Sequence, residues 1–232
     1  MVKKNLILFF GSSGGVGQEL KKLLEKKYKV ISFYNKNKIS KKDSAKVKKL
    51  NFLSNKDINK IPKMIDLSKY KLVILNFASI KIDKLSLYVG ENDYKKTMEV
   101  NVNAFLKIIN KVIPFMMKNN WGRIINVSST GGILGDKGTI LYSMSKNASL
   151  GMMKVMSKEY GKFNITFNTL KLGNFNHGLF MKLKKDFREK LLEKVPSKKT
   201  GNIKNILFAI DFLIKTDYVN GSSINIDGGL DG

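Results

Sequence analysis

A glycine-rich loop separates a short apolar run from an amphipathic segment near the start of the chain. The run covers Asn5–Phe10, the loop reads Gly11-Ser-Ser-Gly-Gly-Val-Gly17, and Leu20, Leu23 and Leu24 follow at helical spacing. A strand, a glycine loop and a helix in this order let backbone N–H groups approach a pyrophosphate at the positive end of the helix. The spacing is neither G-x-G-x-x-G nor a P-loop, so a plain glycine-rich turn is the alternative.

Strand-like and helix-like segments alternate along the rest of the chain. Buried or alternating apolar runs predict further strands at 30–34, 47–52, 72–78, 122–128, 165–170 and 223–227. Helical spacing predicts helices at 18–27, 57–65, 101–117, 142–160, about 180–194 and 203–214. This alternation predicts an α/β fold: one Rossmann-type, doubly wound parallel sheet of about seven strands with helices on both faces. We expect a single domain over residues 1–232, with a polar, basic insertion at about 173–200.

The formal net charge is +25, from 43 Lys and Arg against 18 Asp and Glu. Such an imbalance first suggests a nucleic-acid partner. However, Arg123 and Arg188 are the only arginines, and specific base readout relies on the arginine fork. A hydrophobic fraction of 43% indicates an ordinary globular core. We therefore expect no nucleic-acid partner, and interpret most of the lysines as a solvated background.

Several functional classes are excluded by residues that the chain lacks. It has no Cys and a single His, His177, so disulfides, cysteine nucleophiles and His- or Cys-based metal sites are not expected. The longest apolar run, Leu6–Phe10, is too short for a membrane span or a signal-peptide core. The sequence therefore predicts a cytoplasmic protein with no metal site and no membrane partner.

A Tyr-x-x-x-Lys pair at Tyr142 and Lys146 places a phenol and an ammonium one helical turn apart on one face. A nearby cation lowers the pKa of a phenol, which would let the tyrosine act as a general acid or base near neutral pH. A second such pair, Tyr34 and Lys38, occurs in the chain. Only Tyr142 has a serine, Ser129, thirteen residues upstream at the end of a predicted buried strand.

At these residues the chain resembles the short-chain dehydrogenases/reductases, from Phe10 to Gly229. Its glycines match the family's T-G-x-x-x-G-x-G loop, with Phe10 in place of Thr, and Asn76-Phe-Ala-Ser79 matches N-N-A-G. Leu172-Gly173 stands where Pro-Gly is usual, and Asp227-Gly-Gly229 matches the closing segment. The layout is most similar to the 3-oxoacyl-carrier-protein reductase branch.

This resemblance implies a catalytic set of Asn101, Ser129, Tyr142 and Lys146. Tyr142 would exchange a proton with the substrate oxygen while a nicotinamide carries the hydride. Lys146 would hold the nicotinamide ribose, Ser129 would hydrogen-bond the substrate oxygen, and Asn101 would hold a water of a proton relay. A helix N-cap or buried amide is the alternative for Asn101, and a strand-end hydroxyl is the alternative for Ser129.

The resemblance also implies the residues that bind the cofactor: Gly11, Ser12, Ser13, Gly15, Val16, Gly17, Asn35, Lys36, Asn51, Phe52, Asn76, Ala78, Tyr142, Lys146, Gly173, Phe175 and His177. NAD-preferring relatives usually carry an acid at the end of the second strand, where this chain has no acid before Asp43. Lys36 or Lys38 could instead pair with a 2′-phosphate, so NADP(H) is favoured and NAD(H) is possible. Solvated lysines are the alternative interpretation. Asn51, in place of the family's Asp, would face the adenine.

Three departures from the family pattern lie on the substrate side. His177 stands where a Thr commonly contacts the carboxamide, Leu172 replaces Pro and Ser79 replaces Gly. His177 is interpreted as a loop contact to cofactor or substrate, with a merely exposed His as the alternative. These departures affect the choice of substrate more than the presence of activity.

The sequence therefore predicts an NADPH-preferring carbonyl reductase that reduces a 3-oxoacyl-type or similar ketone, possibly acidic or carrier-bound. Segment 173–200 would shape the substrate lid, and its lysines could meet an acidic substrate or be merely solvated. By the resemblance, the chain would form a homotetramer or dimer through the helices at 101–117 and 142–160. A reductase of a sugar-nucleotide or another small ketone, a non-catalytic nucleotide-binding regulator and a nucleic-acid binder are the alternatives.

Overall fold

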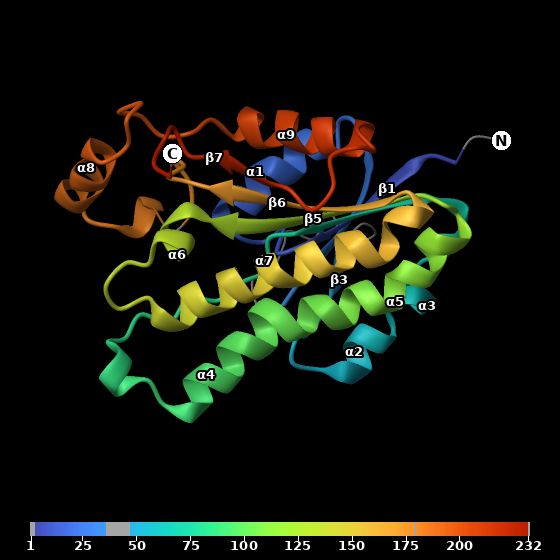
Figure 1. Ribbon diagram of the computed structural model, residues 1–232, viewed down its shortest axis with the longest axis horizontal. Coiled ribbons are helices and arrows are strands. Elements are labelled where there is room, and N and C mark those ends of the chain that lie inside the picture. The colour runs from blue at the N-terminus through green and yellow to red at the C-terminus, as the bar shows by residue number, and fades with distance from the viewer. Residues whose placement is uncertain (1–2, 36–46, 179, 232) are drawn as a thin grey trace.

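Seven parallel strands form one sheet in the order β3-β2-β1-β4-β5-β6-β7 (Figure 1). The computed structural model describes residues 3–35, 47–178 and 180–231. Both the parallel sheet and its number of strands confirm the prediction. The strands are β1 (Asn5–Phe10), β2 (Lys29–Tyr34), β3 (Val47–Lys49), β4 (Lys71–Asn76), β5 (Gly122–Ser129), β6 (Ile165–Leu172) and β7 (Ser223–Ile226).

Helices follow most of the strands and cover both faces of the sheet. In the described part of the chain the α-helices are α1 (Gly15–Leu24), α2 (Asn55–Asn59), α3 (Ile61–Met64), α4 (Glu91–Met98), α5 (Ala104–Lys118), α6 (Thr130–Leu134), α7 (Ile140–Tyr160), α8 (Lys185–Glu193) and α9 (Ile203–Lys215). Short 3-10 helices cover Leu67–Lys69, Ser86–Tyr88, Gly161–Phe163 and Phe180–Lys182. A π-helical turn, Glu99–Asn103, joins α4 to α5.

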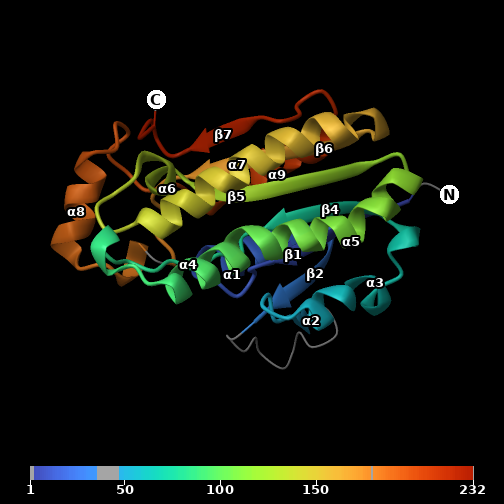
Figure 2. The same ribbon diagram turned by 60° about the horizontal axis from the view of Figure 1, so that its bottom comes forward.

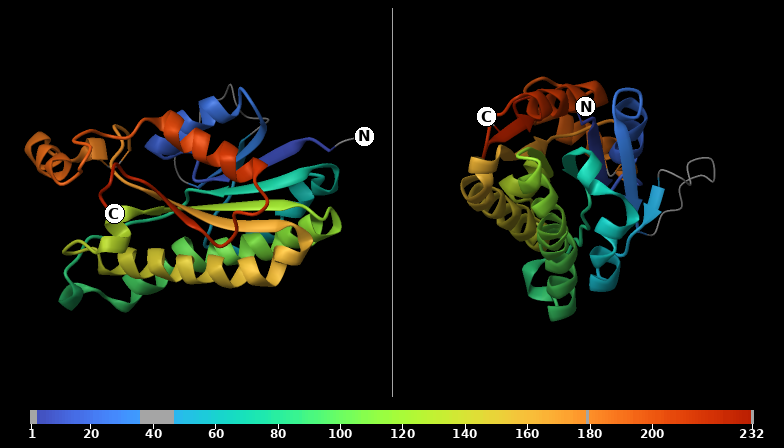
Figure 3. Two further views of the ribbon diagram at one scale, coloured as in Figure 1. Left: turned by 45° about the horizontal axis from the view of Figure 1, so that its top comes forward. Right: turned by 90° about the vertical axis from the view of Figure 1, so that its right-hand side faces the viewer.

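Two hydrophobic cores lie on opposite faces of the sheet, because successive side chains of a strand point in opposite directions. On one face Leu8 packs with residues of α5 and α7, such as Ile109 and Met153. On the other face Phe9 packs with α1 and α9, through residues such as Leu20 and Ile210. Figures 2 and 3 show the resulting three layers, with α5 and α7 on one side and α1 and α9 on the other.

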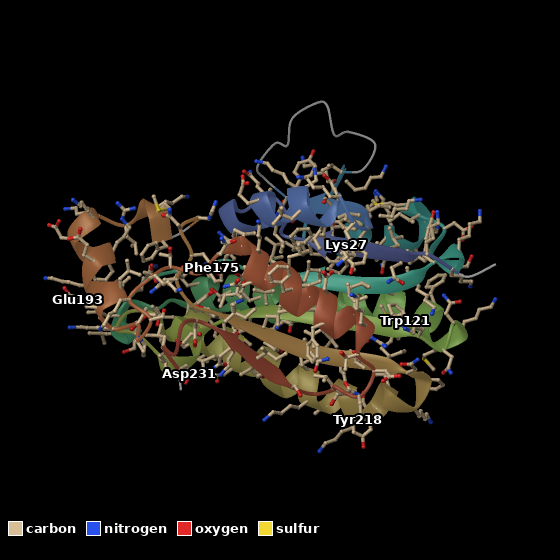
Figure 4. The ribbon with its side chains drawn as sticks, turned by 90° about the horizontal axis from the view of Figure 1, so that it is seen from above. Lys27, Trp121, Phe175, Glu193, Tyr218 and Asp231 are labelled. Carbon is tan, nitrogen blue, oxygen red and sulfur yellow. The ribbon has the colours of Figure 1, made fainter. Side chains whose placement is uncertain are left out.

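All strands point the same way, so their carboxyl ends share one edge of the sheet. The chain order reverses between β1 and β4, which are paired in register from Asn5 with Lys71 to Phe10 with Asn76. In sheets of this kind, a ligand binds outside the carboxyl ends at such a switch point. The short helix α6 and helix α8 lie at that same end (Figure 1). In Figure 4 Glu193 of α8 marks this end and Trp121, just before β5, marks the opposite one.

The predicted helix at 57–65 is in fact two short helices, α2 and α3. The break occurs at Lys60, and Pro62 occupies the first turn of α3. A proline fits the first turn of a helix but removes a hydrogen bond from its interior, which explains why the segment starts again there. The predicted helix from Asn101 begins in the π-helical turn and becomes α-helical at Ala104.

Candidate active site

The glycine loop packs directly on the end of β4. Gly11 has a φ of +82°, and a Cβ there would lie 2.5 Å from the backbone nitrogen of Ala78. A Cβ on Gly17 would lie 2.6 Å from the carbonyl oxygen of Gly11. Glycine is required at both positions, because the backbone turns sharply and approaches neighbouring backbone closely. The loop is therefore fixed between β1 and the start of α1.

The amino end of α1 suits an anionic ligand. Gly14 caps this helix without a side-chain hydrogen bond, and the first turn contains no acidic residue. The unpaired N–H groups and the positive end of the helix dipole are therefore available to a pyrophosphate. A Cβ on Gly15 would lie 2.4 Å from the Cα atom of Gly178, so the segment after β6 passes over this loop. These residues fit a dinucleotide cofactor.

Tyr142 lies in the first turn of α7, beside α6, because a Cβ on Gly132 would lie 2.9 Å from the Cε1 atom of its ring. Two hydroxyl groups act on the pKa of its phenol, that of Ser129 at the end of β5 and that of Ser79 in the segment after β4. Burial is the largest influence and raises the pKa of the phenol above 10; the two serines lower it, and Asp83 raises it. The hydroxyl of Ser129 also caps α6, where it accepts from the backbone nitrogen of Gly132 at 3.4 Å.

Lys146 lies one turn further along α7 and is only 6% exposed. Its Nζ donates to the carbonyl oxygen of Val127 at 3.0 Å and lies 5.4 Å from the centre of the Tyr142 ring. Burial lowers the pKa of this ammonium from 10.5 to about 8. The prediction that Lys146 leaves Tyr142 with a lowered pKa is wrong here, because burial of the phenol outweighs every favourable contact.

Asn101 lies in the π-helical turn and is 5% exposed. Its Oδ1 accepts from the backbone nitrogen of Ile80 at 2.7 Å, and its Nδ2 donates to the Ile80 carbonyl oxygen at 2.9 Å. The same Nδ2 donates to the hydroxyl of Ser145 at 2.9 Å. The amide thus joins the segment after β4 to helix α7. Its predicted role in a proton relay stays a prediction.

A chain of buried amides joins β4 to the same helix. The Nδ2 of Asn76 donates to the Oδ1 of Asn126 at 3.0 Å, and the Nδ2 of Asn126 donates to the Ser149 hydroxyl at 3.2 Å. Ser149 then donates to the carbonyl oxygen of Lys146 at 2.7 Å. Asn76 also accepts from the backbone nitrogen of Ala78 at 3.2 Å. These bonds fix α7 relative to the switch point of the sheet.

The segment after β6 carries the last predicted cofactor residues. Gly173 packs on Asp227, where a Cβ would lie 2.6 Å from the Cα atom. Phe175 is 3% exposed and packs in the core, and it forms an isolated bridge with Gly201. The Nδ1 atom of His177 is buried and has no hydrogen-bond partner within the described residues. Predicted cofactor contacts of all three stay predictions.

The other predicted cofactor residues also follow strand ends. The hydroxyl of Ser12 donates to the carbonyl oxygen of Phe33 at 3.4 Å, Ser13 lies in the glycine loop and Val16 lies in α1. Asn35 directly follows β2, and Lys36 lies outside the described residues. The Oδ1 of Asn51 accepts from the backbone nitrogen of Leu53, whereas Phe52 is buried against Phe10 with ring centres 6.3 Å apart.

Sequence reasoning missed two hydroxyl groups of this site. Ser145 is one of the three unassigned residues between Tyr142 and Lys146. Its hydroxyl accepts from the Nδ2 of Asn101 and donates to the carbonyl oxygen of Tyr142. Ser79 was noted only as a replacement for glycine, although its hydroxyl lowers the pKa of the Tyr142 phenol. Helical spacing could have suggested that Ser145 faces the site, but no sequence signal shows where the loop after β4 folds.

Comparison with known proteins places the chain in a family. The family model described as short chain dehydrogenase matches residues 5–188. Together with the fold and the arrangement at the carboxyl edge, this match shows that the chain belongs to the short-chain dehydrogenase family. It is an NAD(P)-dependent oxidoreductase, and the described residues fit its nicotinamide cofactor.

The chain is also similar to individual relatives. It is 30% identical to a 3-oxoacyl-[acyl-carrier-protein] reductase of Rickettsia conorii, over 96% of this chain and 95% of the relative. It is 30% identical to the protein of the same name from Buchnera aphidicola, over 99% and 98%. The corresponding Thermotoga maritima protein is 34% identical over 68% and 65%.

Solved structures share the fold at lower sequence identity. One, described as ElxO with NADP bound, covers 99% of both chains with a TM-score of 0.84 and 22% identity. Another, described as a putative gluconate dehydrogenase from Agrobacterium tumefaciens, has a TM-score of 0.86 and 20% identity, and covers 97% of this chain and 95% of its own. Within the described residues, no helix is long and apolar enough to cross a membrane.

Proposed function

We propose that the chain is an NADPH-preferring reductase that converts a 3-oxoacyl-type ketone, free or carrier-bound, to an alcohol. The observation that carries this proposal is the convergence of Ser129, Tyr142 and buried Lys146 around Gly132, at the carboxyl end of β5. The names of relatives about 30% identical over nearly the whole chain support the 3-oxoacyl class. The chain is then one domain with a substrate lid at about 173–200.

In this mechanism each residue has a separate task. The N–H groups of the glycine loop and of α1 would hold the pyrophosphate, and Lys146 would hold the nicotinamide ribose. A reduced nicotinamide, when bound, would supply the hydride for the carbonyl carbon. The Ser129 hydroxyl donates a hydrogen bond to the carbonyl oxygen as charge develops there.

Proton transfer then falls to Tyr142. Because its pKa is raised, the phenol is protonated at neutral pH and can donate its proton to the substrate oxygen. In the opposite direction the phenol must first lose that proton, so alcohol oxidation is favoured at higher pH. The raised pKa therefore supports reduction as the direction at neutral pH.

The preference for NADPH rests on the end of β2. No acidic residue occurs between Tyr34 and Asp43 to receive the ribose hydroxyls, and Lys36 and Lys38 offer positive charge to a 2′-phosphate. Both lysines lie outside the described residues. The name of the NADP-bound structure with the same fold is consistent with this choice.

Self-association belongs to the same proposal. Along α7, Ile140, Met144 and Val155 are 41%, 45% and 56% exposed, and a Cβ on Gly151 would meet nothing within 4 Å. These residues form an exposed stripe at near-helical spacing, on which a second copy could pack as a homodimer or homotetramer. Sedimentation of the Met144→Glu variant, which should fall to a smaller species, tests this part.

A panel of ketones tests the proposed activity. We expect NADPH oxidation with 3-oxobutanoyl thioesters and little with sugar or steroid-like ketones, and no NADPH oxidation with Tyr142→Phe. Because Tyr142 does not hold the pyrophosphate, this variant should still bind NADPH in a fluorescence titration. Unchanged reduction by Tyr142→Phe would reject the mechanism. Cofactor binding without turnover of any ketone would instead favour a non-catalytic regulator.

A further inference from the structure

Residues 227–231, which follow β7, form a closed turn around the side chain of Asp227, and we call them the C-terminal turn. The Oδ1 of Asp227 accepts from the backbone nitrogen of Gly229 at 3.0 Å, and its Oδ2 accepts from that of Asp231 at 3.2 Å. Asp231 also pairs with Lys171 of β6, with 2.7 Å between Oδ2 and Nζ. The C-terminal turn is thus held in one shape, at the end of the sheet where α6 and α8 lie (Figure 1).

A side chain from a distant part of the sequence completes the contacts of Asp227. The hydroxyl of Thr130 donates to the Oδ2 of Asp227 at 2.9 Å. Thr130 is 0% exposed, so water cannot satisfy its hydroxyl and a partner within the protein is needed. Thr130 directly follows Ser129 and is the first residue of α6. Asp227 therefore anchors the start of α6 to the C-terminal turn.

The Ser129 hydroxyl depends on the backbone around it for its position. Its contact with the backbone nitrogen of Gly132 is 3.4 Å, which is longer than a usual hydrogen bond. Before Ser129 the backbone is held by the sheet, where β5 pairs with β6 up to Ser129 opposite Leu172. After Ser129 it is held at Thr130, through Asp227. Loss of the second anchor would leave the serine fixed from one side.

The start of α6 also contacts the other two proposed catalytic side chains. A Cβ on Gly132 would lie 2.9 Å from the Cε1 atom of Tyr142 and 3.1 Å from the Cγ atom of Lys146. The side chains of Ser129, Tyr142 and Lys146 therefore surround this short helix. A shift of its first turn would move the Ser129 hydroxyl relative to the phenol, although both belong to the same proposed site.

We propose that Asp227 is a positioning residue, which holds the Ser129 hydroxyl in place for the substrate oxygen through its hydrogen bond with Thr130. This inference rests on the proposed function, in which Ser129 donates to the carbonyl oxygen as charge develops there. Such a donor is effective only where the charge develops, and a misplacement of about 1 Å costs roughly a hundredfold in rate. Asp227 exchanges no proton in this role and acts only through Thr130.

Other contacts keep the C-terminal turn in place when the Thr130 hydroxyl is removed. The backbone nitrogen of Ser197, after α8, donates to the carbonyl oxygen of Gly228 at 3.1 Å, and that of Gly173 donates to the carbonyl oxygen of Ile226 at 3.1 Å. The bonds from Asp227 to the backbone of the turn also remain. Removal of this one hydroxyl therefore tests the link to α6 without unfolding the turn.

The test replaces Thr130 by Val, which keeps a similar shape and removes the hydroxyl. With a 3-oxobutanoyl thioester and NADPH, kcat for reduction should fall at least about tenfold, because Ser129 is no longer held from both sides. The Kd for NADPH should change less than about twofold. Thr130→Ser keeps a hydroxyl and should restore kcat to within about threefold of the wild type. Thr97→Val is the matched control and should leave kcat unchanged, because Thr97 is also 0% exposed but its hydroxyl has no partner among the described residues.

Two double-mutant cycles distinguish positioning from a general structural effect. In the Ser129→Ala background the positioned hydroxyl is absent, so Thr130→Val should lower the residual kcat less than about twofold. Asp227→Ala should lower kcat at least as much as Thr130→Val does. Because both variants break one bond, the double variant should be no slower than Asp227→Ala alone.

The outcomes separate this role from the proposed function. An unchanged kcat in Thr130→Val, an equal fall in both Ser129 backgrounds, or effects of Asp227→Ala and Thr130→Val that multiply would each overturn the positioning role of Asp227. With Ser129→Ala impaired, any of these results leaves the proposed function intact. Full activity of Ser129→Ala would instead overturn the mechanism proposed for the site.

Discussion

Asn101 binds Ile80 through both ends of its side-chain amide, accepting from its nitrogen and donating to its carbonyl oxygen. The side-chain amide of Asn101 thus bonds to the backbone of Ile80 as a residue of a neighbouring β-strand would. Asn101 lies in the π-helical turn Glu99–Asn103, which joins α4 to α5, and is one of the buried residues of that turn. Ile80 lies in the segment after β4, so the position of that segment depends on this contact.

Replacement of Asn101 by Ala should therefore impair both folding and catalysis. It leaves the nitrogen and carbonyl of Ile80 and the hydroxyl of Ser145 without their partner, at a cost of roughly 2–4 kcal/mol of unfolding free energy. Urea unfolding measures this loss, and kcat for ketone reduction should fall while NADPH binding changes little. Asn103→Ala is the matched control, because the exposed side chain of Asn103 in the same turn bonds only to Glu99 among the described residues. Equal stability of the two variants would contradict this account.

Lys146→Met should make the protein more stable and inactive. Burial lowers the pKa of the Lys146 ammonium from 10.5 to about 8, which corresponds to roughly 3 kcal/mol of lost stability at pH 7. The variant also loses the hydrogen bond to the carbonyl oxygen of Val127, which reduces this gain in stability by about 1 kcal/mol. We therefore expect a net gain of roughly 2 kcal/mol in urea unfolding at pH 7. A variant less stable than the wild type would disprove this prediction.

The stability gain of Lys146→Met should depend on pH. Because the folded-state pKa is lowered, the unfolded wild-type chain binds more protons than the folded one between about pH 8 and 10.5. Wild-type stability therefore rises with pH in that window. Below it, the buried ammonium of Lys146 lowers the stability of the wild type by its full amount. The difference in unfolding free energy between Lys146→Met and the wild type should be largest at pH 7 and smaller at pH 9. A difference that is the same at both pH values would show that the ammonium is not desolvated.

Gly15→Ala should weaken cofactor binding, whereas Gly14→Ala should not. A Cβ on Gly15 would lie 2.4 Å from the backbone of Gly178, so the segment after β6 must move off the glycine loop. At Gly14 the nearest atom would be 3.6 Å away, and its φ of −74° suits any residue. NADPH fluorescence titration should give at least a tenfold higher Kd for Gly15→Ala than for Gly14→Ala. Equal Kd values would mean that the two segments separate freely.

Lys36→Asp should shift the preference from NADPH towards NADH. An acid at the end of β2 repels a 2′-phosphate and accepts hydrogen bonds from ribose hydroxyls. The ratio of kcat/KM for the two cofactors should change by more than tenfold, and a variant at Lys26, in the segment after α1, is the control. An unchanged ratio in Lys36→Asp would assign the phosphate contact to another residue.

Much of the fold could be predicted because buried parallel strands leave a clear pattern. The predicted first strand agrees with β1 at both ends, and the strands from Val30, Gly122 and Ser223 agree to within one residue. Helix α4 was missed, since Thr97 is its only buried residue and no apolar stripe marks it. The helix predicted from Asn101 becomes α-helical only at Ala104. The π-helical turn before it was missed, because apolar spacing in a sequence does not distinguish such a turn from an α-helix.

The site was predictable where residues lie close in sequence and less so where loops meet. Tyr142 and Lys146 share one face of α7, as their spacing predicts, and Ser129 ends β5 beside them. The sign of the Tyr142 pKa shift was wrong because it depends on burial, which is set by the whole fold. The position of the segment after β4 was missed because it depends on the long-range contact between Ile80 and Asn101.

Helix α8 has no buried residue, and the segment around it is fixed where it leaves and rejoins the body. Phe175 bridges to Gly201, whose nitrogen donates to the carbonyl oxygen of Asn174 at 2.8 Å. The residues of α8 itself can therefore be exchanged without repacking the core, whereas the buried Val195 that follows it must be kept. Grafting the matching helix of a relative in place of α8, as part of the proposed lid, should transfer its choice of ketone while thermal stability is kept. Selection can thus diversify the substrates of this scaffold at little cost to its folding.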